Sequence, residues 1–127
     1  MAHIKDLQKI VHQMAKEKGW WDDVDGKPRD IASQFVNFHA EISEAWEEVR
    51  DGKPFNKIIY HESQAHGEGE DTTERILKPC GVPIELADCV IRIMDTCEAY
   101  EIDLEEAILE KIKFNQTRPY RHGGKKF

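Results

Sequence analysis

Residues 84–100 restrict the fold of this chain more than any other segment, because they are apolar around most of a helical circumference. At about 100° per residue, the remaining arc is one strip about 80° wide. That strip carries Glu85, Asp88, Arg92 and Asp95. A helix that is apolar on most sides lies at the centre of its fold. Its charged strip must therefore face water, a charged partner or a metal ion.

Three further segments, 3–18, 30–50 and 103–115, have the periodicity of amphipathic helices. Asp30 and Asp103 stand at the expected N-caps of the second and fourth helices. Between the second and third helices we expect an irregular loop or a short hairpin. The sequence thus predicts an all-α, four-helix fold over residues 1–127 as a single domain, with a basic non-helical tail at 117–127.

Two apolar faces lead to expectations about the core. In the second helix the apolar residues are spaced by three and four positions, so we expect this stripe, including Trp46, to be buried. Its members are Ile31, Phe35, Phe38, Ile42, Trp46 and Val49. In the fourth helix the expected buried side is marked by Leu104, Ala107, Ile108 and Ile112.

Composition excludes several classes of function. A net charge of −7 leaves no broad basic face for a nucleic-acid backbone. The chain has no apolar run long enough for a transmembrane helix, and its first residues lack the apolar stretch of a signal peptide. We therefore expect a cytoplasmic protein with neither nucleic-acid nor membrane partners. Its three cysteines do not suggest a disulfide framework.

Two acidic pairs are the strongest candidates for chemistry. Glu41 and Glu44 lie three apart on the second helix, and Glu85 and Asp88 lie three apart on the third. Facing each other, the four carboxylates would offer the oxygen ligands that Mg²⁺ prefers, with Mn²⁺ as a second possibility. Neither pair has the histidine that a di-iron site requires. Either pair alone is equally compatible with a solvated acidic surface.

The fourth helix and the tail carry candidate phosphate ligands. Lys111 and Asn115, four residues apart, fall on the apolar side of the helix, where each needs a polar partner. A phosphate would serve, although a lysine can also extend to the rim of an apolar face. The basic tail that follows would close over phosphates, dock on a second subunit or remain in solvent; it contains Arg118, Arg121, His122, Lys125 and Lys126.

At these residues the sequence resembles the MazG-like, all-α nucleoside triphosphate pyrophosphohydrolases. The ExxE and ExxD pattern of that family appears as EISE at 41–44 and ELAD at 85–88, and KIKFNQTRPYRHGGK at 111–125 is also similar. The resemblance implies Mg²⁺-dependent cleavage between the α- and β-phosphates, which gives a nucleoside monophosphate and pyrophosphate. It also implies a bundle completed as a homodimer or dimer of dimers. The long spacer at 45–84 departs from the family pattern.

These motifs suggest roles for individual residues. Glu41 and Glu44 are the catalytic candidates, with Glu44 as the base that accepts a proton from water. The phosphate ligands would be Lys111, Asn115, Arg118 and Lys125. Trp20 or Trp21 would stack on the base, unless this pair instead fills a core or a subunit contact.

Two rival functions remain open at this stage. One is an acidic helical module that binds a metal or a partner protein without turnover. The other is a related all-α pyrophosphatase that acts on phosphoribosyl-ATP.

Overall fold

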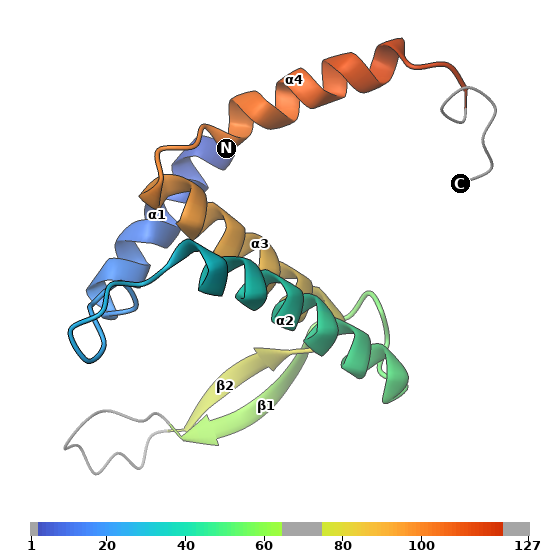
Figure 1. Cartoon of the computed structure of the whole chain (residues 1–127). Helices are drawn as coiled ribbons and strands as arrows, with labels where there is room; N and C mark the ends of the chain where they lie inside the picture. The colour runs from blue at the N-terminus through green and yellow to red at the C-terminus, as the bar shows by residue number, and fades with distance from the viewer. Residues whose placement is uncertain (1–2, 65–74, 121–127) are drawn as a thin grey trace. The chain divides into compact units, whose positions relative to one another are not determined.

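The computed structural model describes residues 3–64 and 75–120. They form, in chain order, α1 (Ile4–Glu17), α2 (Ile31–Arg50), β1 (Ile59–Gln64), β2 (Arg75–Cys80), α3 (Val82–Ala99) and α4 (Leu104–Thr117) (Figure 1). The described part is thus mostly helical, with one small antiparallel sheet, and it agrees with the predicted helical class and its hairpin alternative. Within it, no helix has both the length and the apolar character needed to cross a membrane.

The chain divides into two compact units, which we describe separately. The first unit comprises Met1–Asp22 and Met94–Phe127, and the second comprises Asp23–Ile93. α3 belongs to both, because its first twelve residues lie in the second unit and its last six in the first.

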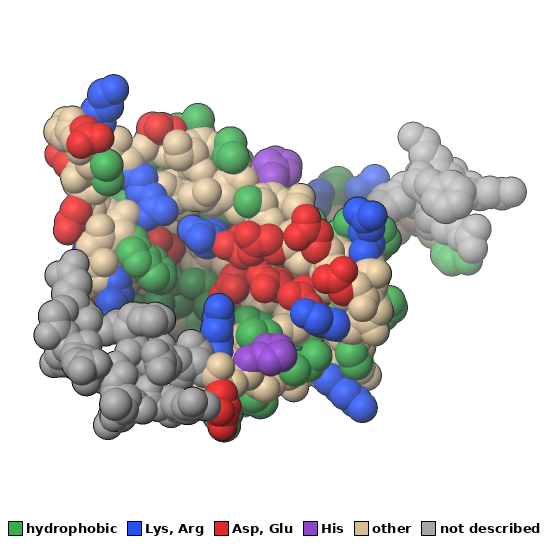
Figure 2. Space-filling model, turned by 90° about the horizontal axis from the view of Figure 1, so that it is seen from below, with side chains coloured by type: hydrophobic (Ala, Val, Ile, Leu, Met, Phe, Trp, Pro, Cys, Tyr) green, Lys and Arg blue, Asp and Glu red, His purple; other side chains and the backbone are tan. Residues whose placement is uncertain are grey.

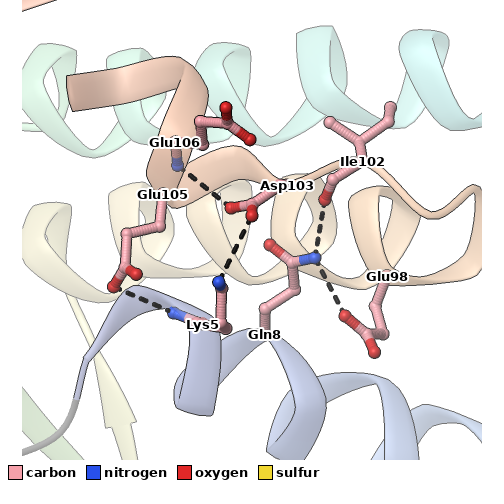
Figure 3. Close-up of polar contacts among 7 residues, drawn as sticks. All are labelled: Lys5, Gln8, Glu98, Ile102, Asp103, Glu105 and Glu106. Atoms are coloured by element: carbon pink, nitrogen blue, oxygen red, sulfur yellow. Dashed lines mark hydrogen bonds and ion pairs between the residues drawn. The ribbon is translucent and has the colours of Figure 1, made fainter. Parts of the chain in front are cut away.

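In the first unit, α1 packs against the end of α3 and the turn that follows it. The buried apolar side chains here are Val11, Ala15, Met94 and Cys97. Polar contacts reinforce this packing (Figure 3). The amide of the buried Gln8 donates to Glu98 and to the backbone carbonyl of Ile102, both at 2.9 Å. Lys5 pairs with Asp103 at 3.3 Å.

In the second unit, α2 lies beside the first part of α3, and the hairpin joins them (Figure 1). Asp30 caps α2 by accepting from the backbone N–H of Ser33 at 2.7 Å, which confirms the predicted N-cap. The strands pair antiparallel, with Ile59 opposite Cys80. The hairpin therefore returns the chain to the side of α2 before α3 begins.

Gly81 makes the turn from β2 into α3. Its φ is +104°, a conformation that is costly for residues with a Cβ. A Cβ on Gly81 would also lie 3.0 Å from the backbone oxygen of Lys57. Both observations require glycine here, and this tight turn sets where the first turn of α3 begins.

α2 turns a different face inward from the one that its apolar stripe predicts. Its buried residues are Gln34, Glu41 and Ala45. Trp46 is 59% exposed, so the prediction that it belongs to the core is wrong for the single chain. Other members of the stripe, Ile31, Phe35 and Ile42, are between 43% and 55% exposed. The glutamate-bearing side faces α3 instead. These four members of the apolar stripe are left exposed, whereas the other two, Phe38 and Val49, are half-buried.

α4 buries none of its residues. The expectation that Ala107 and Ile112 lie on a buried side is therefore wrong for the single chain, in which both are exposed. The predicted cap is confirmed, since the Asp103 carboxylate accepts from the N–H of Glu106 at 3.0 Å. Local capping thus starts the helix, whereas the described residues of this chain do not supply the packing expected along its length.

Candidate functional site

Three glutamates from two helices meet in the second unit. Glu41 and Glu44 come from successive turns of α2, and Glu85 comes from the first turn of α3. One carboxylate oxygen from each of the three lies within 4.8 Å of those of the other two. We call these residues the glutamate group. Figure 2 shows a face of the molecule on which Asp and Glu side chains gather into a patch bordered by Lys and Arg.

Glu41 is the innermost member of the group, with 7% of its surface exposed. Its Oε1 accepts a hydrogen bond from Arg92 Nε at 2.5 Å. Its Oε2 is buried and has no hydrogen-bond partner among the described residues. A buried carboxylate oxygen without a donor is costly, because it has lost its water without replacement. A cation held by the glutamate group would remove that cost.

Glu85 responds first to its burial and then to the neighbouring carboxylates. Burial raises the pKa of Glu85, and the nearby charges of Glu44 and Asp88 raise it further, to about 7 from its usual 4.5. A hydrogen bond between the Glu85 and Glu44 carboxyls acts in the same direction. In the absence of a cation, therefore, Glu85 holds a proton over part of the neutral pH range.

Asp88 lies next to the glutamate group without belonging to it. Burial and the charge of Glu41 raise its pKa, whereas Arg92 and Lys78 act in the opposite direction. Lys78 is a residue that the sequence analysis missed. It lies on β2, opposite His61, and the approach of this strand to α3 depends on the register of the hairpin. No local sequence pattern connects it with Asp88.

The glutamate group fits a hard divalent cation. Three carboxylates supply oxygen ligands of the kind that Mg²⁺ and Mn²⁺ take, and such ions keep further positions for water and phosphate. The orphaned Oε2 of Glu41 is an independent feature that suits the same ion. The described side chains around this group supply no cysteine or histidine to it that would favour a softer metal.

The predicted phosphate ligands belong to the first unit. Lys111 and Asn115 are exposed on α4, as is Arg118 just beyond it. Lys111 Nζ lies 5.0 Å from the centroid of the Phe114 ring, and the Arg118 guanidinium lies 5.9 Å from it. Lys125 and the other basic residues of the tail beyond Tyr120 lie outside the described residues. A role of these groups in phosphate binding stays a prediction.

The two tryptophans have different surroundings. Trp21 donates its indole N–H to the buried Asp95 at 2.8 and 3.0 Å. Asp95 also accepts from His12 Nδ1 at 2.7 Å, and the Trp21 ring packs edge-on against the rings of His12 and Tyr100. This favours the core role for Trp21. Trp20, 48% exposed, is the better placed of the two to meet a ligand.

The Asp95 contacts were also missed from the sequence. Asp95 shares the charged strip of α3 with Glu85 and Asp88, and nothing in the strip itself separates their roles. In the structure Asp95 belongs to the first unit. Its carboxylate accepts hydrogen bonds from His12 on α1 and from Trp21, which follows α1.

Comparison of the chain with models of known families, with curated proteins and with solved structures found no match.

Proposed function

We propose that the chain is a Mg²⁺-dependent hydrolase that cleaves ribo- or deoxyribonucleoside triphosphates to a nucleoside monophosphate and pyrophosphate. The main support is the buried Oε2 of Glu41 within the glutamate group, which has no hydrogen-bond partner in the part of the chain that the structure describes. The ExxE and ExxD spacing and the resemblance to MazG-like enzymes supply the reaction class. We expect the activity in the cytoplasm, where nucleoside triphosphates and Mg²⁺ are both plentiful.

In this proposal Glu41, Glu44, Glu85 and Asp88 hold the cation. A bound Mg²⁺, or Mn²⁺ in its place, offsets the phosphate charge and makes water more acidic. Glu44 is the exposed member of the group, so solvent reaches it most easily. Its carboxylate also shares a hydrogen bond with that of Glu85. We assign Glu44 as the base that takes the proton of the attacking water.

Other residues would hold the substrate in line for that attack. Lys111, Asn115 and Arg118, together with Lys125, are proposed to bind the phosphates. Trp20 is proposed to stack on the base. When water attacks the α-phosphorus, the bond to the bridging oxygen breaks. Pyrophosphate then leaves with its charge offset by Lys111, Arg118 and Lys125.

A second copy of the chain is proposed to complete the protein, as a homodimer or a dimer of dimers. The support is the exposed apolar stripe of α2 and the absence of any buried residue on α4. Large apolar side chains gathered on one helical face typically mark an interaction surface. Trp46→Glu is expected to reduce the mass measured by light scattering, whereas Ala40→Glu, about 120° around α2 from Trp46, leaves it unchanged. Equal masses for Trp46→Glu and wild type would contradict this surface.

The test of the function is pyrophosphate release from a nucleotide panel in the presence of Mg²⁺. Turnover is expected in the wild type and is lost in Glu41→Gln and Asp88→Asn, while circular dichroism shows intact folding. Glu47→Gln changes an exposed glutamate of the same helix outside the glutamate group, so it serves as the matched control. No release from any triphosphate would favour the binding module, and release from phosphoribosyl-ATP alone would favour the related pyrophosphatase.

A further inference from the structure

The two carboxylate oxygens of Glu41 have different surroundings, because only one of them accepts a hydrogen bond from Arg92. Arg92 Nε donates to Oε1 at 2.5 Å, while Oε2 is buried without a partner among the described residues. The Glu41 side chain is 9% exposed and that of Arg92 is 39% exposed. The arginine thus approaches from the solvent side and holds one oxygen of a carboxylate that is otherwise inside.

We propose that Arg92 is a positioning residue that fixes the carboxylate of Glu41 so that Oε2 is presented to a divalent cation. This inference rests on the proposed metal site and adds a specific residue to it. The planar guanidinium donates along a defined direction, so the contact at Oε1 restricts rotation of the carboxylate. Substitution of a residue that holds a metal ligand in this way typically lowers metal affinity by about 10- to 100-fold.

The opposing explanation is that Arg92 acts only through its charge. A positive charge in contact with a metal ligand repels the incoming cation, so charge alone would weaken metal binding. Positioning has the opposite effect, because it prepares Glu41 for the ion. The two explanations therefore predict changes of opposite sign when the charge of Arg92 is removed.

The experiment measures Mn²⁺ affinity without nucleotide, by paramagnetic resonance titration, on wild type, Arg92→Lys and Arg92→Gln. Lysine keeps the charge but loses the planar donor, and glutamine loses both the charge and the guanidinium that holds Oε1. We expect affinity to fall about tenfold in both variants. The matched control is Arg50→Lys, which changes an exposed arginine of α2, and it is expected to bind Mn²⁺ as the wild type does. Glutamine removes the charge, so a fall in its Mn²⁺ affinity cannot come from charge alone, and it tests the proposal even if the lysine variant fails to fold.

Several outcomes would overturn the proposal. Wild-type affinity in Arg92→Lys, or tighter binding in Arg92→Gln, would leave only a charge effect. A wild-type protein that does not bind Mn²⁺ would overturn the proposed metal site itself. The double variant Arg92→Gln with Glu41→Gln separates the two roles further. Because Arg92 is proposed to act through Glu41, the double variant is expected to bind no more weakly than Glu41→Gln alone, and an additive loss would contradict this.

Discussion

Replacement of Glu85 by glutamine tests whether the glutamate group is as tightly coupled as its geometry indicates. The substitution keeps the size and polarity of the side chain but removes its ability to ionise. In the folded chain the pKa of Glu85 is raised to about 7, because of burial and the charges of Glu44 and Asp88, whereas its usual value is 4.5. Between these two values, the folded state holds a proton that the unfolded state has released.

The sign of the effect follows from this difference. Because the folded state binds the proton more tightly, the contribution of Glu85 to the free energy of unfolding falls as the pH rises from 4.5 to about 7. At about 1.4 kcal/mol per unit of pKa, the full shift corresponds to about 3 kcal/mol. Glu85 is partly exposed, and solvent screening reduces this to about 1–2 kcal/mol.

The assay is urea unfolding without metal at pH 5 and at pH 8, followed by circular dichroism. Other groups titrate in the same interval, so the useful quantity is the stability of Glu85→Gln minus that of the wild type. We expect this difference to become more favourable to the variant by about 1–2 kcal/mol from pH 5 to pH 8. Glu47→Gln, at an exposed position outside the group, is expected to show no such change.

Addition of Mg²⁺ at pH 8 should reverse the advantage of the variant. A ligand that binds only the folded state stabilises it according to its concentration and affinity, and the wild type is expected to gain more than Glu85→Gln. The reasoning is refuted if the stability difference between the two proteins is the same at pH 5 and pH 8 without metal. In that case neither burial nor the neighbouring carboxylates would raise the pKa of Glu85 in the folded chain.

Two further substitutions test the packing that places the site. Gly81→Ala is expected to lower the free energy of unfolding by about 1–3 kcal/mol, because of the positive φ and the 3.0 Å approach to the Lys57 oxygen; a urea midpoint equal to that of the wild type would show that the turn relaxes freely. Asp95→Ala is expected to cost about 2–4 kcal/mol in the same assay, because it leaves the donors of His12 and Trp21 without their shared acceptor. A loss below about 0.5 kcal/mol would mean that water replaces Asp95.

Local features of this protein could be predicted from its sequence. The helices follow from apolar periodicity, and the caps at Asp30 and Asp103 follow from side chains that reach backbone N–H groups three residues away. The spacing of Glu41 and Glu44 puts them on one side of α2, and the expectation that they meet Glu85 agrees with the structure. Each of these depends on interactions within one helix or on a simple pairing of two helices.

Only the tertiary structure decided which side of each helix is covered. α2 has both an apolar stripe and an acidic side, and the structure turns Glu41 inward and leaves Trp46 exposed. The pairing of Arg92 with one oxygen of Glu41, and the approach of Lys78 to Asp88, likewise depend on contacts between distant segments. A helical period shows that two different faces exist, but the neighbour of each face is decided by tertiary packing between segments far apart in the chain.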